Sequence, residues 1–345
     1  MAMAVSYRLR CASTILGFLL ASFAGGARTT GPAIPIPHPM TMLLRTESVR
    51  RELGLSVEQT AAVAKMAEEA ELPLWRLRDL PGPERDEAAG PILEKLRTGL
   101  RDVLPGRQID RLEQLDLQAR GIQAVFEPRV VEALKLTSGQ RERMRAILGS
   151  PAHNISPAEV EGSLRAVLSL AQQRILASLM GRPFDLSRLP QIACKAPEVE
   201  GVTEWINSPP MTLEKLRGKV VVVHYYAFGC INCIRNLPHY NGWFDRFSRD
   251  EVAILGIHRP ETEAERDIEN VRRKVAEAGI KYPVAVDNES HNWDAWVNRV
   301  WPSVYLIDKR GFVRYWWYGE LNWQDAQGEL WMRARIAELS AESAG

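Results

Sequence analysis

Residues 219–235 read KVVVVHYYAFGCINCIR, and this stretch decides the fold of the second half of the chain. The unbroken run from Val220 to Val223 predicts a strand that is buried on both faces of a sheet. Two cysteines, Cys230 and Cys233, follow at the point where a helix is predicted to begin and to run to about Phe247. A Cys-x-x-Cys pair between a buried strand and a helix is typical of a dithiol redox site.

The place of this pair explains its predicted chemistry. Unpaired N–H groups at a helix N-terminus favour negative charge, so Cys230 is expected to react as a thiolate. Cys230 is therefore the candidate nucleophile that attacks a disulfide. Cys233 is the candidate resolving thiol, which breaks the mixed disulfide that the attack leaves.

Three other interpretations of the pair compete with this one. A structural disulfide that closes so short a loop would contribute roughly 2 kcal/mol, against nearly 5 kcal/mol for a loop of about 100 residues. A zinc site needs about four ligands, and a second Cys-x-x-Cys or His pair is missing, so neither a metal nor another cofactor is predicted. Two unrelated free cysteines would not explain the strand-to-helix placement. Redox activity is the interpretation that the context favours.

Strand and helix patterns continue to alternate beyond the pair. Strands are predicted at 252–257, 283–286, 304–307 and 313–317, and helices at 264–278 and 327–339. Trp301-Pro302 comes directly before the third of these strands. Pro302 either forms a cis peptide bond there or is an ordinary proline at a strand start. The pattern predicts a central mixed β-sheet flanked by helices.

Several motifs of this half occur together and in a fixed order. They are Leu216-Arg217-Gly218-Lys219, Cys230 to Arg235 with Pro238, Tyr282-Pro283-Val284, Asp287-Asn288, Trp301 to Asp308, Gly311 and Gly319-Glu320. With them, residues 196–340 resemble the thioredoxin-like superfamily, especially the TlpA/ResA and DipZ C-terminal branch of extracytoplasmic thiol-disulfide oxidoreductases. The resemblance implies that Pro302 is a cis-proline facing the redox pair. It also implies that the backbone of Trp301 hydrogen-bonds a substrate strand.

The sequence departs from that family at two positions near the pair. Many members carry a buried acid six residues before the first cysteine, where this chain has His224. A neutral imidazole there could act as a general base for Cys233 or could simply pack within the sheet, and both interpretations stay open. Gly229 replaces a common Trp, which leaves an opening that Phe228 or Trp301 is expected to cover in part. A peroxidase is the weaker hypothesis because the Pro and Thr of peroxiredoxins are missing before Cys230.

The first half of the chain is poor in aromatic residues and rich in good helix formers. Residues 53–59 and 134–140 share the pattern Leu-x-Leu-Ser/Thr-x-x-Gln, which is a helix capping box. Residues 156–159 form a similar capping pattern, and residues 104–108 form an incomplete one. A bundle of about four to six helices is therefore expected. The paired motifs resemble the LTxxQ motif of Spy/CpxP-like periplasmic proteins. They either only build helices or, as that resemblance implies, support a surface for a partner protein.

The N-terminus has the pattern of an export signal, with Arg8 and Arg10 before an apolar stretch too short to span a bilayer. The predicted organisation is a cleaved signal peptide at 1–27, a Pro-rich leader at 28–39, a helical LTxxQ-like domain at 40–189 and a thioredoxin-like domain at 190–345. Cys11 would leave with the signal, and Cys194 is expected to be a semi-buried thiol outside the redox pair. The mature chain is predicted to be periplasmic or secreted, without an integral membrane segment.

Length and charge agree with this organisation. The chain has 345 residues, enough for two domains, and a net charge of +1 that gives no support for nucleic-acid binding. The predicted partners are protein thiols and disulfides together with an unidentified redox partner. The leading prediction is an α-helical bundle followed by a thioredoxin-like domain that acts as a thiol-disulfide oxidoreductase. The alternative is a chaperone-like binding protein whose thioredoxin-like domain docks partners without turnover.

Overall fold

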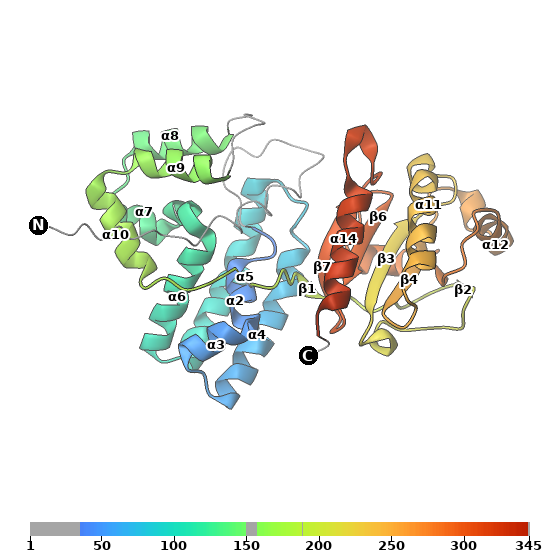
Figure 1. The fold of residues 1–345 in the computed structure, drawn as a ribbon, viewed down its shortest axis with the longest axis horizontal. Coiled ribbons are helices and arrows are strands. Elements are labelled where there is room, and N and C mark those ends of the chain that lie inside the picture. Colours follow the sequence, from blue (N-terminus) through green and yellow to red (C-terminus); the bar gives the residue numbers. More distant parts are fainter. Residues whose placement is uncertain (1–34, 150–156, 188, 344–345) are drawn as a thin grey trace, which may run out of the picture. The chain divides into compact units, whose positions relative to one another are not determined.

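The computed structural model describes residues 35–149, 157–187 and 189–343. The predicted signal peptide and the predicted cap at Ser156 lie outside these residues. The chain divides after Pro190 into a helical unit and an α/β unit (Figure 1).

The described part of the helical unit contains nine α-helices and one 3-10 helix, more than the four to six that were expected. Three of them are only seven residues long. The first two are separated by Thr46, whose extended backbone breaks the helix, and α7 ends at Lys135, which is left-handed at φ 49°. The elements are α2 (Pro39–Arg45), α3 (Glu47–Leu53), α4 (Val57–Trp75), α5 (Gly82–Val103), α6 (Gly106–Arg120), η1 (Gly121–Phe126), α7 (Pro128–Leu134), α8 (Ser138–Gly149), α9 (Pro157–Val167) and α10 (Leu170–Met180).

Two predicted capping boxes are present, and their glutamines do more than cap. Gln59 accepts from the N–H of Ser56, as the motif requires. Its Nε2 also donates to Gln108 Oε1 (2.9 Å) and to the carbonyl of Val103 (3.1 Å). In return, Gln108 Nε2 donates to the carbonyl of Leu53 (3.0 Å). We call this reciprocal pair the first glutamine clasp, because it ties the start of α4 to the start of α6.

A second glutamine clasp repeats the first. Gln140 Nε2 donates to Gln172 Oε1 (2.8 Å) and to the carbonyl of Val167 (3.0 Å). Gln172 Nε2 donates to the carbonyl of Leu134 (3.0 Å). Gln172 belongs to a further capping box with Ser169, which the sequence analysis missed although the pattern Leu-Ser-x-x-Gln is present. The clasps explain why the motif specifies glutamine rather than any capping residue.

The α/β unit is built on a mixed sheet of seven strands in the order β1-β7-β6-β3-β4-β5-β2. The central β3 runs parallel to β4 and antiparallel to β6, so both of its edges are paired and every one of its residues is buried. The strands are β1 (Cys194–Lys195), β2 (Glu204–Ile206), β3 (Val220–Tyr226), β4 (Val252–His258), β5 (Val284–Val286), β6 (Ser303–Ile307) and β7 (Phe312–Tyr318).

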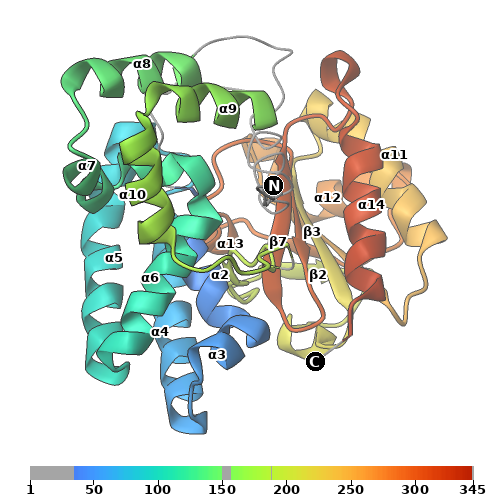
Figure 2. The same ribbon diagram turned by 60° about the vertical axis from the view of Figure 1, so that its left-hand side comes forward.

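Helices cover both faces of this sheet. Side chains of α11 (Ile231–Arg246), α12 (Ile268–Glu277) and α14 (Gly328–Ala341) share one apolar core with Val220 and Val222 of β3. Figure 2 shows α11 and α14 together on one side of the sheet. The short α13 (His291–Ala295) packs against Tyr225 through the ring of Trp293, 6.0 Å between centroids. Because successive residues of a strand point to opposite faces, Tyr225 marks the other face.

This architecture confirms the predicted thioredoxin-like sheet flanked by helices. The two-residue β1, the three-residue β2 and the five-residue α13 were not predicted. The helix predicted from residue 264 begins at Ile268, because the side chain of Asp267 accepts from the N–H groups of Glu269 and Asn270 and caps it there. Cys194 is fully buried in β1 rather than semi-buried, and β7 and β6 stand between β1 and β3.

Candidate active site

The Cys-x-x-Cys pair lies in the first turn of α11, at the carboxyl end of β3. Cys230 is the N-cap of the helix, with an extended backbone, and its side chain is partly exposed. Cys233, one turn on, is 1% exposed. Both side chains are thiols in this structure. A substrate disulfide can reach Cys230, whereas Cys233 is accessible chiefly to Cys230.

The surroundings of Cys233 keep its proton in place. Burial, followed by a hydrogen bond with Cys230, raises the pKa of the Cys233 thiol well above its ordinary value. The Glu261 carboxylate adds to this effect, and the backbone of Ala227 opposes it. Tyr226 and Tyr240 interact with the same sulfur, and burial raises the pKa of both phenols. Cys233 therefore needs a proton acceptor before it can attack as a thiolate.

His224 lies among these phenol rings. It stacks on Tyr240, with 4.2 Å between ring centroids, and its Nε2 is 3.1 Å from the hydroxyl of Tyr282. Burial lowers the pKa of His224 to about 3. The imidazole is thus neutral near pH 7, and it is a weak proton acceptor because so low a pKa reflects a poorly tolerated charge. These contacts support a packing role for His224, and its catalytic role stays a prediction.

At Gly229, where an opening was expected, the backbone contacts a residue that the sequence pattern does not single out, Glu265. The N–H of Gly229 donates to Glu265 Oε1 at 2.6 Å, and a Cβ at position 229 would stand 2.8 Å from the same oxygen. Glu265 is 1% exposed. A local signal for it exists, since Thr262 and Glu265 form a capping box. Its contact with the redox loop, however, depends on the tertiary structure.

Phe228 and Trp301, the two candidate covers, each stack on another ring. Phe228 lies on His258, with 5.5 Å between centroids, and Trp301 lies on Trp293 at 4.1 Å. The guanidinium of Arg259 is 4.8 Å from the ring of Trp301. Trp301 therefore belongs to a small stack with Trp293 and Arg259.

The Trp301–Pro302 peptide bond is cis. Ser303, the next residue, is paired with Tyr225 on β3. This register puts Trp301 and Pro302 at the carboxyl end of β3, where the chain also leads to Cys230. The two predicted substrate-side residues and the predicted nucleophile thus share one end of the sheet.

Burial also lowers the pKa of His258, a residue that the sequence pattern did not single out. Its ring is fully buried, and neither ring nitrogen has a hydrogen-bond partner among the described residues. Burial lowers the pKa of His258 to about 4, although the Glu265 carboxylate opposes this shift. Nothing in the pattern of β4 distinguishes this histidine from an ordinary strand residue.

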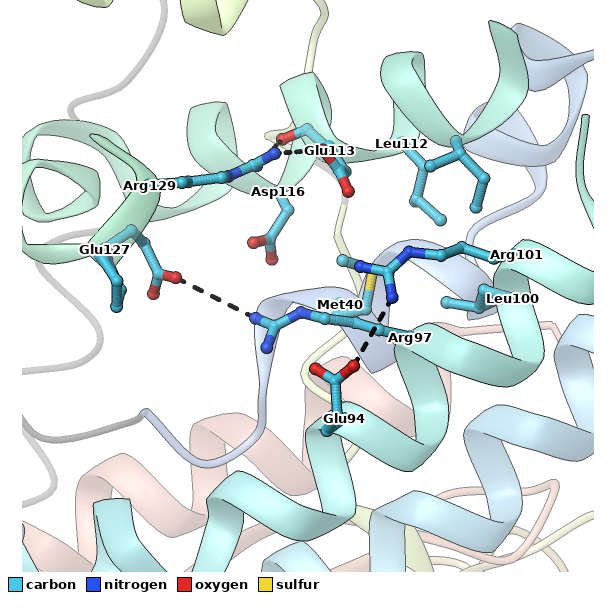
Figure 3. Close-up of a pocket in the computed structure, with 12 residues that line it drawn as sticks. Met40, Glu94, Arg97, Leu100, Arg101, Leu112, Glu113, Asp116, Glu127 and Arg129 are labelled. Carbon is cyan, nitrogen blue, oxygen red and sulfur yellow. Dashed lines mark hydrogen bonds and ion pairs between the residues drawn. The ribbon is translucent and has the colours of Figure 1, made fainter. Parts of the chain in front are cut away.

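A separate pocket of about 240 Å³ lies within the helical unit (Figure 3). Arg129 pairs with Glu113, and Arg101 is 3.5 Å from Glu94, so the charges around the pocket largely neutralise each other. Its lining contains no cysteine or histidine, which separates it from the redox chemistry. The lining residues are Met40, Glu94, Arg97, Leu100, Arg101, Ile109, Leu112, Glu113, Asp116, Glu127, Pro128 and Arg129.

No group of three or more His, Cys, Asp or Glu side chains in residues 35–149, 157–187 and 189–343 could hold a metal ion. Within those same ranges, no helix is long and apolar enough to cross a bilayer.

Comparison with known proteins places the site in a family. The description "AhpC/TSA family" matches residues 192–316. Thiol-disulfide oxidoreductase YkuV of Bacillus subtilis is 30% identical over 148 residues, which cover 43% of this chain and 95% of YkuV. The chain belongs to the thioredoxin-like thiol-disulfide oxidoreductases of the AhpC/TSA family. The predicted thioredoxin-like resemblance is thereby confirmed.

Other relatives share only this part. Protein DipZ of Mycobacterium tuberculosis is 43% identical over 128 residues, which cover 36% of this chain but 18% of DipZ. A solved structure of a thiol-disulfide isomerase from Corynebacterium glutamicum is 26% identical and covers 43% of this chain and 98% of its own, with a TM-score of 0.37. The resemblance of residues 40–189 to Spy/CpxP-like proteins stays a prediction.

Proposed function

We propose that this protein exchanges disulfides with the cysteines of other proteins, outside the cytoplasm, through Cys230 and Cys233. The observation that carries the proposal is the unequal exposure of the two thiols. Cys230 is partly exposed at the start of α11, and Cys233 is buried one turn behind it. This asymmetry suits a nucleophile that meets the substrate and a resolving thiol that meets only the nucleophile.

The exchange takes two steps in which electrons balance. The Cys230 thiolate attacks one sulfur of a substrate disulfide, and the other sulfur leaves as a thiolate. Cys233 then gives up its proton and attacks Cys230 Sγ, which forms the Cys230–Cys233 disulfide and releases the second substrate thiolate. The substrate is reduced by two electrons and the pair is oxidised; the reverse sequence oxidises a dithiol. The N-terminus of α11 stabilises the charge on Cys230 in both directions.

The other predicted site residues support this proposal by their placement. Trp301 and Pro302 lie at the carboxyl end of β3, next to Tyr225 in register. A substrate strand that pairs with the backbone of Trp301 would present its disulfide from this edge. Phe228 packs over His258 and would form the apolar floor of the approach.

Extracytoplasmic location follows from the predicted signal peptide and from the resemblance of residues 196–340 to exported family members. The helical unit would bind partner proteins in that compartment, and the pocket in Figure 3 is a candidate contact for them. Mass determination of the exported protein tests the location. A mature chain that begins near residue 28 is expected, and a chain that keeps its first 27 residues in the cytoplasm would contradict it.

The activity is tested by the reduction of insulin disulfides with dithiothreitol as the electron source. The intact protein is expected to accelerate the reaction, and Cys230→Ser is expected to abolish the acceleration. Cys233→Ser should instead accumulate a mixed disulfide with the substrate. Unchanged insulin reduction by the Cys230→Ser variant would overturn the proposed enzymatic activity. Cysteine-independent binding of unfolded protein to the helical unit would favour the docking alternative.

A further inference from the structure

The side chain of Arg259 lies at the end of the sheet from which the redox loop leaves. Arg259 directly follows β4, and its N–H donates to the carbonyl of Tyr226, the last residue of β3, at 3.0 Å. Trp301 comes two residues before β6, which pairs with the other edge of β3. The guanidinium carbon of Arg259 is nevertheless 4.8 Å from the centroid of the Trp301 ring. The two side chains therefore meet at the carboxyl end of β3, where the chain continues to Cys230.

Several contacts hold this guanidinium in place. Besides the ring of Trp301, the ring of Trp293 lies 5.2 Å from it, and the two indoles stack on each other at 4.1 Å. Arg259 Nε donates to the hydroxyl of Ser290 at 3.1 Å, and Nη1 donates to the carbonyl of Pro260 at 3.0 Å. The side chain is thus positioned before a ligand arrives, so binding would cost it little conformational entropy.

Much of the hydrogen-bonding capacity of Arg259 is open. A guanidinium has five N–H donors, and the hydrogen bonds to Ser290 and Pro260 use two of them. Nη2 donates to no acceptor within residues 35–149, 157–187 and 189–343, and it is not enclosed, so it faces solvent. No carboxylate of those residues forms an ion pair with Arg259, and the charge of Arg259 acts on Glu261 only from beyond ion-pair distance. Arg259 therefore presents a fixed and open guanidinium, whose planar fork matches the geometry of a carboxylate.

We propose that Arg259 is a specificity-determining residue, which selects protein substrates that carry an acidic side chain beside the reacting cysteine. The inference rests on the proposed function and names the substrate class of the same site. A substrate strand that hydrogen-bonds the backbone of Trp301 passes the guanidinium that lies against the Trp301 ring. Side chains of a strand alternate between its two faces, so an Asp or Glu one or two residues from the cysteine can point to Arg259. The open N–H groups then donate to the oxygens of that carboxylate.

Matched pairs of peptide substrates measure this preference. Each peptide has one cysteine, joined by a disulfide to an aromatic thiol that absorbs light only after release. The two members of a pair differ by Glu or Gln at one of the two positions on either side of the cysteine. Attack by Cys230 on the peptide sulfur releases the aromatic thiolate, so absorbance gives the second-order rate constant of the reduced full-length protein. Division by the rate constant of dithiothreitol with the same peptide removes the effect of Glu on the intrinsic reactivity of the disulfide.

Arg259→Gln is the decisive variant, and Arg249→Gln is its matched control. Arg249 is exposed and also lies against an aromatic ring, 4.5 Å from Phe244, but it precedes β4 and so lies at the opposite end of that strand. Wild type and Arg249→Gln are expected to react about fivefold faster with Glu than with Gln at the best position, the effect of one partly exposed ion pair. Arg259→Gln should react equally with both peptides. Arg259→Lys, which keeps the charge but loses the fork, should retain a smaller preference.

Two outcomes overturn different statements. The same ratio of Glu to Gln rate constants in wild type and Arg259→Gln, at all four positions, would overturn the role of Arg259 and leave the proposed function intact. Each ratio compares two peptides on one protein, so a general loss of activity in the variant cancels. Release of the aromatic thiol by wild type that is no faster than release by Cys230→Ser would overturn the proposed function, and the role of Arg259 with it.

Discussion

Acid should destabilise the α/β unit through two buried histidines. His224 and His258 are fully buried, and burial lowers their pKa values to about 3 and about 4. In the unfolded chain both return to a pKa of about 6.5, so below that pH the unfolded state binds more protons than the folded state. The free energy of unfolding must therefore fall as the pH drops from about 6.5 towards 3.

The size of the effect follows from these pKa values. Between pH 8 and pH 5, linkage gives a loss of about 2 kcal/mol for each histidine, or about 4 kcal/mol for the pair. His258→Phe removes one contribution cleanly, because neither ring nitrogen of His258 has a hydrogen-bond partner among the described residues and Phe228 already stacks on the ring. The variant should be at least as stable as wild type at pH 8. At pH 5 it should be about 2 kcal/mol more stable, beyond any difference found at pH 8.

Urea unfolding at the two pH values measures this difference. Nine of the ten tryptophans lie beyond Pro190, so tryptophan fluorescence follows the α/β unit. The same variant at pH 8 is the control for packing changes. A stability difference between His258→Phe and wild type that is equal at both pH values would refute the assignment of the acid sensitivity to His258.

Three further changes test other features. Gly229→Ala puts a Cβ 2.8 Å from Glu265 Oε1, which its hydrogen bonds hold in place, so we expect a loss of about 2 kcal/mol in urea unfolding and slower insulin reduction. Wild-type values for both would contradict the close contact between Glu265 and Gly229. Gln59→Met and Gln140→Met each break one glutamine clasp, and each should lower the free energy of unfolding of the helical unit by about 2 kcal/mol, as measured by thermal unfolding. A loss below about 0.5 kcal/mol would show that the clasps only cap helices. Arg314→Met removes the guanidinium that lies 3.2 Å from the buried carboxylate of Asp308. The variant should lose about 3 kcal/mol in free energy of unfolding, as measured with urea. An unchanged urea midpoint would argue against a buried charge at Asp308.

The central part of the fold could be predicted because its signals are local and strong. The β-branched run from Val220 to Val223 favours a buried strand, and the paired cysteines mark the start of α11. The strands β1 and β2 have two and three residues, too few to show an alternating pattern. The number of helices in the first half was wrong because a single residue such as Thr46 interrupts a pattern that reads as continuous.

The candidate site shows the same division between local and tertiary information. Cys230 and Cys233 were singled out from four adjacent residues. Glu265 reaches Gly229 across 36 residues of chain, and no sequence pattern specifies that contact. His224 was noticed through its position, but its low pKa is caused by burial, and the rings of Tyr240 and Tyr282 that pack against it come from other parts of the chain.

The two glutamine clasps give the helical unit a modular character. The paired glutamines are 49 residues apart in the first clasp and 32 in the second, and the partners of each clasp belong to one half of the unit. Each half also has its own apolar cluster, around Leu43 and Leu115 in one and around Met144 and Leu164 in the other. Such segments can open and close as separate cooperative units. One half is therefore expected to unfold locally while the clasp of the other half stays closed.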